Sequence, residues 1–178
     1  EIGGNLTLTS GAAAGITDTG TVTVAGNLVA TTDAGNGVIN LGTTTVTGTM
    51  DLTSNGSGDV TIDNATSDIV LIASEIGGNL TLTSGAAAGI TDSATVTVGG
   101  NLVATTDANN GVINLGTMAI DGTVALTTNG NGAATIVNDA GLNFTTSTVG
   151  GALSATATTG DITDSGNLAI TGAATFIT

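Results

Sequence analysis

The most constraining feature of this sequence is an internal repeat. Residues 1–18 (EIGGNLTLTSGAAAGITD) recur letter for letter as residues 75–92, and a weaker copy begins at Val149. A shorter step lies inside this unit, because the segment that starts at Asn5 is followed at equal intervals by related segments at Asn27 and Thr49. Fixed periods of this kind are typical of repeat architectures, in which each unit packs only on its neighbours.

Each of these shorter steps contains short segments of alternating character. Leu6–Thr9, the segment that starts at Ile16, and Thr21–Val24 alternate apolar and polar residues, and Gly-rich corners separate them. Alternation at every second residue predicts a strand with one buried and one exposed face. Residues one step apart match in type, which favours strands stacked on their equivalents one turn along, at about 4.8 Å. An antiparallel sandwich is the alternative, but it does not explain this match.

We therefore predict an all-β fold: a single-stranded parallel β-solenoid with a triangular outline. The step from Asn5 to Asn27 corresponds to about 22 residues per turn, a period within the range of solenoid repeats. Each turn has three short strands, and the chain is long enough for about seven turns. Residues 1–178 form one continuous solenoid, with repeat units 1–74 and 75–148 and a partial unit 149–178. The third and sixth turns carry extra residues around Ile69–Ile72 and Leu142–Phe144, which we expect to form long loops.

Two columns of residues are expected to run the length of the rod. The inward column is Leu6, Leu28, Met50, Leu80, Leu102, Val124 and Leu153, and the outward column is Thr9, Thr31, Thr53, Thr83, Thr105, Thr127 and Thr156. Glycines such as Gly4, Gly15 and Gly26 are expected at the corners. Asn5, Asn27, Asn79 and Asn101 are expected there in the left-handed backbone region, which Asn tolerates.

The charge of the chain excludes several kinds of partner. It has 14 acidic residues, no Lys, Arg or His, and a net charge of −14. Such a surface repels phosphate backbones and anionic lipids, so we expect no nucleic-acid partner. We also expect no membrane insertion, because no apolar run reaches the ~20 residues of a membrane span. The chain begins at a repeat boundary and not at Met, so we interpret it as a segment of a longer chain or a fibre subunit.

The residue types needed for catalysis are missing. Lyase sites on solenoids use a cation to stabilise developing negative charge, and serine or cysteine triads use an imidazole, and this chain has no Lys, Arg or His. An inverting glycosidase needs only two carboxylates, but Asp18 and Asp92 each stack on non-acidic residues of the next turn. We expect the protein not to be an enzyme and to need no cofactor.

Calcium is the one metal that the sequence suggests. Asp59, Asp63 and Asp68 lie together in the third turn and Glu75 follows them, and carboxylates are the ligands that calcium prefers. The Gly-Gly-x-Gly-x-Asp repeat of calcium-binding rolls is absent, and the second copy has Ala133 in place of Asp59. Solvated corner carboxylates are the alternative interpretation.

The motif Gly4-Asn5-Leu6-Thr7-Leu8-Thr9, then Gly15-Ile16-Thr17-Asp18, then Thr21 to Leu28, resembles the repeats of large bacterial surface proteins. These are the filamentous-haemagglutinin-like and autotransporter-associated β-strand repeat proteins. The resemblance covers essentially the whole chain. It implies a right-handed β-helical rod that is secreted to the cell surface or beyond it, and that acts as an adhesin, stalk or fibre.

We therefore expect a non-catalytic, extracellular structural rod that is joined at its ends to copies of itself or to the rest of a longer repeat chain. An adhesin arm is the alternative, with loops 63–68, 73–77 and 147–150 contacting a cell-surface receptor or a glycan. Ice binding is a third hypothesis, because Thr7/Thr9, Thr21/Thr23 and Thr81/Thr83 form Thr-x-Thr pairs, and a flat array of such pairs could order water. Asp51 would interrupt this flat array.

Overall fold

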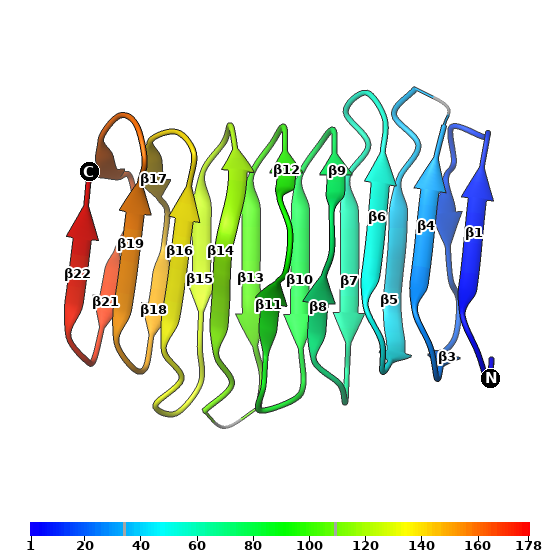
Figure 1. Ribbon diagram of the computed structural model, residues 1–178, viewed down its shortest axis with the longest axis horizontal. Helices are drawn as coiled ribbons and strands as arrows, with labels where there is room; N and C mark the ends of the chain where they lie inside the picture. Colours follow the sequence, from blue (N-terminus) through cyan, green and yellow to red (C-terminus); the bar gives the residue numbers. More distant parts are fainter. Residues whose placement is uncertain (34, 109) are drawn as a thin grey trace.

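The computed structural model describes residues 1–33, 35–108 and 110–178, and it shows a rod made of two parallel β-sheets (Figure 1). The described residues form strands and turns and contain no helix. None of the described residues therefore belongs to a helix of the length and apolar character that a membrane crossing requires. The chain passes from one sheet to the other and back, so that each turn adds one level to each sheet.

We call the two sheets sheet 1 and sheet 2. Sheet 1 contains β1 (Leu6–Ser10), β4 (Leu28–Thr32), β6 (Met50–Ser54), β8 (Ile69–Leu71), β9 (Ser74–Ile76), β11 (Ile90–Asp92), β12 (Val96–Val98), β14 (Ile113–Ile120), β16 (Ala134–Asn138), β19 (Leu153–Ala157) and β22 (Ala174–Ile177). Sheet 2 contains β2 (Ile16–Thr17), β3 (Val22–Val24), β5 (Ile39–Val46), β7 (Val60–Asn64), β10 (Leu80–Ser84), β13 (Leu102–Thr106), β15 (Val124–Thr127), β17 (Leu142–Phe144), β18 (Ser147–Val149), β20 (Ile162–Asp164) and β21 (Leu168–Ile170).

This arrangement confirms the predicted parallel β-solenoid, with about 22 residues per turn. Leu6, Leu28 and Met50 lie in register on neighbouring strands of sheet 1, as the sequence period predicts. Leu28 and Met50 are fully buried, whereas Leu6, at the end of the rod, is half-buried. The inward residues of both sheets form one continuous aliphatic core.

The number of turns is about eight, not about seven, because each full repeat unit spans three and a half turns. The identical segments Leu6–Ser10 and Leu80–Ser84 consequently lie in opposite sheets, as β1 and β10. The predicted Thr column is therefore wrong at Thr53 and Thr83. Thr53 lies beside Glu75 in sheet 1, and Thr83 lies beside Asp63 in sheet 2.

We call this change of sheet between equivalent segments a sheet exchange. A second sheet exchange follows in the next repeat, after Thr127, which lies beside Thr148 in sheet 2. Thr156 lies in sheet 1, beside Val137. Each exchange adds half a turn, and the two together make up the eighth turn. The inward column breaks at the same places. Leu80 begins a strand of sheet 2, whereas Met50 before it lies in sheet 1, and Leu153 begins a strand of sheet 1, whereas Val124 before it lies in sheet 2.

The expected long loops are also wrong, because most of their residues form strands. Residues 69–71 and 74–76 form β8 and β9, and residues 142–144 and 147–149 form β17 and β18. Asp63 lies within β7, so only a short turn at residues 65–68 remains of the first predicted loop. The extra residues carry apolar alternation of their own, and pairing in the sheet satisfies their backbone groups.

A buried asparagine side chain makes each exchange possible. The shorter strand β7 stacks on the longer β5 and stops before the end of it, which leaves Val46 without a strand above it. Asn64 Oδ1 accepts a hydrogen bond from Val46 N at 2.8 Å, and Asn64 Nδ2 donates to Val46 O at 3.0 Å. Asn138 makes the same pair of bonds with Ile120 at 2.8 and 3.1 Å. Each amide thus replaces one peptide group of the absent strand.

Asparagine also stabilises the exposed corners, by a mechanism different from the one expected. The only described non-glycine residues with positive φ are Asn36 and Asn110, both at 64°, so none of the four predicted residues, Asn5, Asn27, Asn79 and Asn101, is left-handed. Their side chains form ladders along the rod instead. Asn5 Oδ1 accepts from Asn27 N at 2.9 Å, and Asn79 Oδ1 accepts from Asn101 N at 2.8 Å.

These Asn ladders explain why a glycine directly precedes the residue whose backbone N–H donates to the Asn side chain of the previous turn. A Cβ atom on Gly26 would clash with Asn5 Oδ1 and with the Gly4 backbone. A Cβ atom on Gly100 would lie 2.6 Å from Asn79 Oδ1. Glycine is required here for close approach of successive turns, not for an unusual backbone angle.

We predict that Asn64→Ala destabilises the protein by about 3 kcal/mol, because it leaves the buried N–H and C=O of Val46 unpaired. The midpoint of urea unfolding followed by circular dichroism measures the effect. Asn114→Ala is the control, since Asn114 is exposed on the outer face of β14. Equal losses in the two variants would contradict the role given to Asn64.

Candidate functional site

The four residues of the predicted calcium site do not come together. Asp63 points outward from β7 in sheet 2, and Glu75 points outward from β9 in sheet 1. Asp59 Oδ1 accepts a hydrogen bond from Asn79 N at 2.7 Å, and Asp68 Oδ1 accepts one from Gly89 N at 3.2 Å. Among the described residues, no three His, Cys, Asp or Glu side chains are grouped so as to hold a metal ion.

Asp63 has an electrostatic environment of its own. Burial on the face of sheet 2 raises the pKa of the Asp63 carboxyl, and the negative charge of Asp107 raises it further. Both causes disfavour the charged form of an acid. The folded state therefore binds this proton more tightly than the unfolded chain does.

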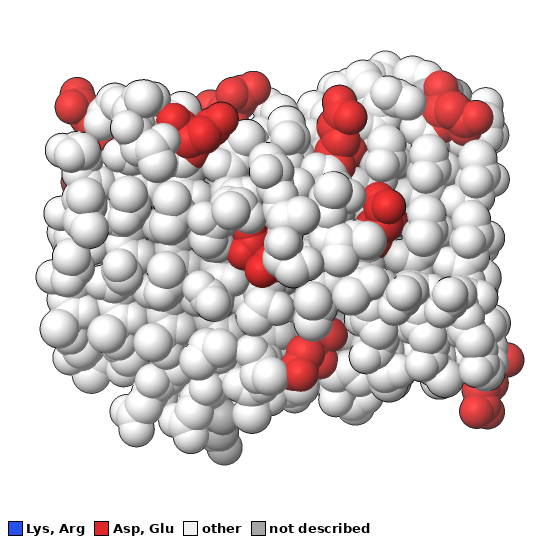
Figure 2. All heavy atoms as spheres, viewed as in Figure 1, with Lys and Arg blue, Asp and Glu red and all other residues white. Residues whose placement is uncertain are grey.

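Acidic residues are otherwise spread over the rod. Figure 2 shows single carboxylates separated by uncharged surface, with no basic residue on the face in view. With no Lys, Arg or His in the sequence, these carboxylates have no side-chain counter-ion within the chain. Four of them, Asp18, Asp59, Asp68 and Asp92, accept hydrogen bonds from backbone N–H groups of the next turn.

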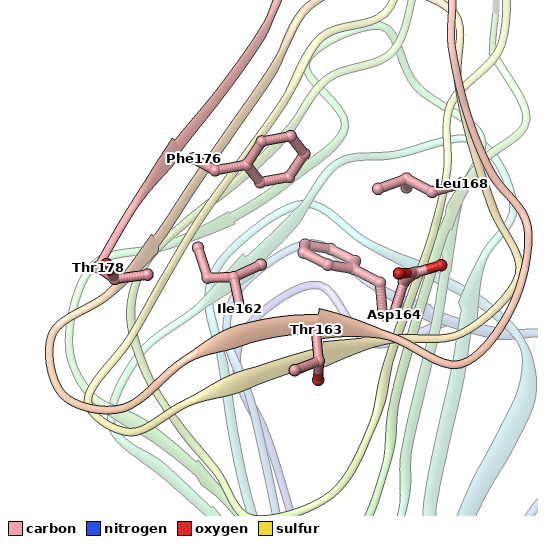
Figure 3. Close-up of a pocket in the computed structure, with 7 residues that line it drawn as sticks. Ile162, Thr163, Asp164, Leu168, Phe176 and Thr178 are labelled. Atoms are coloured by element: carbon pink, nitrogen blue, oxygen red, sulfur yellow. The ribbon is translucent and has the colours of Figure 1, made fainter.

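A recess lies at the C-terminal end of the rod (Figure 3). It has a volume of about 370 Å³, and its lining residues are Phe144, Ile162, Thr163, Asp164, Leu168, Phe176 and Thr178. In Figure 3 the last turn has a triangular outline, and the labelled Ile162, Leu168 and Phe176 lie on its three sides. Phe144 and Phe176 are the only two phenylalanines of the protein.

This recess is an exposed cross-section of the core. Ile90 and Val96, which hold the matching positions one repeat earlier, are fully buried by the next turn. Ile162 and Leu168 are only half-buried, and Phe176 is 47% exposed. The end of the rod thus presents apolar side chains that the interior of the rod covers with a further turn.

A carboxylate lies among these apolar side chains. Asp164 is in register with the fully buried Phe144, and Figure 3 shows its side chain on the inner side of the turn. The neighbouring hydroxyls of Thr163 and Ser165 donate back to the previous turn, to Leu142 O and Phe144 O. Within the described part of the chain, no donor reaches the Asp164 carboxylate.

The same Ile-Thr-Asp sequence occurs twice in the interior, where the aspartate does have donors. Asp18 Oδ1 accepts a hydrogen bond from Gly42 N at 3.0 Å. The Asp92 carboxylate accepts from Gly116 N and Thr117 N, both at 2.7 Å, and from the Thr117 hydroxyl. In both cases the donors belong to the next turn of the solenoid.

The chain matches the family described as repeats of unknown function (DUF5649), over residues 57–112 and 131–178, together more than half of its length. It belongs to this family. The two matched segments begin at equivalent places in the two repeat units, just before β7 and β16, so the DUF5649 unit opens with the strand that carries Asn64 or Asn138. The searches of curated proteins and of solved structures gave no match.

Membership of DUF5649 shows a repeat protein, and together with the structure it fits a repeat β-helix. The finer resemblance to filamentous-haemagglutinin-like and autotransporter-associated proteins stays a prediction. Sequence reasoning missed the roles of Asn64 and Asn138 and of the three Ile-Thr-Asp aspartates. Both groups carry a signal, because Asn64 and Asn138 hold the same place in the two repeat units and Ile-Thr-Asp recurs at 16–18, 90–92 and 162–164.

The raised pKa of Asp63 gives a prediction with a defined sign. Stability falls as pH rises from the unfolded-state value of 3.8 through the higher folded-state pKa, because the folded state binds the proton more tightly. Asp63→Asn should raise the free energy of unfolding at pH 7, by less than about 1 kcal/mol for this partly exposed group, and the urea midpoint should rise with it. At pH 3 the variant and the parent should unfold at the same midpoint, and a variant less stable at pH 7 would contradict the assignment.

Proposed function

We propose that this protein is a non-catalytic structural rod: a rigid stalk, spacer or fibre segment that works outside the cell. The observation that supports the proposal is the ladder of parallel strands, which runs through both sheets from β1 to β22. One aliphatic core fills the space between the sheets. A rod of this kind separates two points in space, and it needs no reactive group to do so.

Stiffness follows from the way in which successive turns are joined. Each strand pairs with the strand above it, and Asn and Asp side chains add further bonds from turn to turn at the corners. The two exchange points do not interrupt the ladder, since the amides of Asn64 and Asn138 replace the missing backbone partners. Within the described ranges, the rod thus has no long loop at which it could bend.

The charge of the rod suits an exposed position. Fourteen acidic residues without a basic one give a surface that repels other rods, and charge repulsion of this kind favours solubility. The absence of Lys and Arg leaves no cleavage site for proteases of trypsin specificity. Both features support the proposal of an extracellular location.

An adhesin arm is the second candidate, in a form different from the one first expected. Segments 73–77 and 147–150 lie largely in strands, and segment 63–68 is reduced to a short turn at residues 65–68, so none of them forms the long contact loop that this hypothesis required. The observation that favours a binding role is the outer face of β10, β13 and β15, which carries Thr, Val and Ala and no charged residue. Val103 on this face is 38% exposed.

The proposal predicts the dimensions of the protein in solution and its indifference to metal. About eight spacings of ~4.8 Å give a rod roughly 4 nm long. Small-angle scattering of the chain, and negative-stain images of native material, should show stiff rods of unchanged form with and without a calcium chelator. A flexible or globular profile would contradict the structural role, and rods that dissolve in chelator would restore calcium as a structural partner.

A further inference from the structure

The corners of the rod carry five Asn-Gly pairs, the dipeptide most susceptible to spontaneous deamidation. In this reaction the backbone nitrogen that follows the asparagine attacks the side-chain amide carbon. Glycine favours the attack because it has no Cβ atom to hinder the approach. The five asparagines are Asn36, Asn55, Asn110, Asn129 and Asn131. All of them are exposed, so exposure does not decide which one reacts.

Two of these asparagines are bonded to the next turn of the rod. Asn36 Oδ1 accepts hydrogen bonds from the backbone N–H and from the hydroxyl of Ser57, both at 2.8 Å. Asn110 Oδ1 accepts one from Asn131 N at 2.8 Å. Each side chain must break these bonds before it can turn toward its own backbone, and the need to break them slows the reaction.

Two more asparagines are bonded to the preceding turn. Asn55 Nδ2 donates to Thr32 O at 3.1 Å, and Asn129 Nδ2 donates to Asp107 O at 3.2 Å. The backbone carbonyl of each also accepts two hydrogen bonds, one from the preceding turn and one from within its own corner. Both the side chain and the backbone of these two asparagines are therefore held in place.

Asn131 lies at the end of its ladder. Among the described residues, no hydrogen bond reaches its side-chain amide or its backbone carbonyl. The next turn has no N–H group to offer at this level, because Gly150 N donates to Thr128 Oγ1 at 3.0 Å and Gly151 N donates to Gly132 O at 2.8 Å. Neither of these glycines has a side chain that could supply a donor instead.

We propose that Asn131 is the deamidation site of this rod, and that turn-to-turn hydrogen bonds protect the other four asparagines. Gly132 N attacks Asn131 Cγ, and the new N–C bond closes a succinimide ring. The Cγ–Nδ2 bond breaks, and ammonia leaves with the proton of Gly132 N. Water then adds to one of the two ring carbonyl carbons and opens the ring to aspartate or to its β-linked isomer, isoaspartate. The reaction needs only water, and the proposal does not depend on the structural function proposed above.

The attacking nitrogen becomes available without any loss of strand pairing. Gly132 N donates to Asn129 O at 3.1 Å, a bond within the corner between the end of β15 at Thr127 and the start of β16 at Ala134. Local opening of this one turn releases the nitrogen while both strands stay in place. The product adds one negative charge to the net charge of −14, at a place where the first repeat has Ser57.

Peptide mapping of the folded chain tests the proposal. The protein is incubated at mildly alkaline pH in water enriched in oxygen-18 and is then digested with pepsin in acid, which stops the reaction. Conversion during the incubation raises a peptide's mass by about 3 Da, and conversion in ordinary water by about 1 Da. Fragmentation assigns the change to one asparagine. We expect Asn131 to convert at least about fivefold faster than the other four, the factor that corresponds to one hydrogen bond.

Three controls separate the effect of the fold from that of the sequence. Asn131→Ser introduces the residue of the first repeat, and it should remove the fast conversion and leave the urea midpoint unchanged. Ser57→Asn should create a fast site in the first repeat, because the glycines of the next turn, Gly77 and Gly78, already donate to backbone carbonyls. In concentrated urea, where these turn-to-turn bonds are lost, all five Asn-Gly pairs of the parent chain should convert at similar rates.

Three results would overturn the proposal. In the folded chain, Asn131 could convert no faster than the four bonded asparagines. A preference for Asn131 could persist in urea, which would show that the sequence and not the fold sets the rate. The Ser57→Asn variant could convert at position 57 as slowly as the parent chain does at Asn36, which would show that the end of a ladder is not the reactive place.

Discussion

The whole structure depends on one requirement: every backbone N–H and C=O of a turn must find its partner in the turns above and below. A parallel ladder meets this requirement only where strands of successive turns have the same length and position. Side-chain packing sets the column of aliphatic residues, but unpaired backbone groups decide where a strand can end. Wherever the strand pattern changes, the chain carries a polar side chain that completes the ladder.

The exchange of the two sheets shows this dependence most clearly. A repeat of three and a half turns sends each identical segment to the opposite side of the rod, so a short strand must stack on a longer one once per repeat. Asn64 and Asn138 make that step possible from fully buried positions. Aspartates serve the same purpose at the corners, as Asp92 does for Gly116 and Thr117.

Much of the fold could be predicted from the sequence, because residues one period apart match in type only if they stack. Leu6, Leu28 and Met50 do so, as expected. The alignment of Thr53 with Thr83 failed, because periodicity in sequence does not reveal on which side of a rod an added half-turn ends. The calcium site at Asp59, Asp63, Asp68 and Glu75 depended on a different assumption, that residues close in sequence in a long third turn also lie close in space. Once β7 and β9 lie in opposite sheets, Asp63 and Glu75 point away from each other.

The sheet exchange is the central claim, and engineered cysteine pairs test it directly because the protein has no cysteine of its own. A disulfide needs Cα atoms about 4.4–6.8 Å apart, which outward residues on adjacent parallel strands satisfy. Under mild oxidation, a chain with Thr53→Cys and Glu75→Cys should form an internal disulfide, and one with Thr53→Cys and Thr83→Cys should stay reduced. The opposite result would place Thr53 and Thr83 on one face and contradict the three-and-a-half-turn repeat.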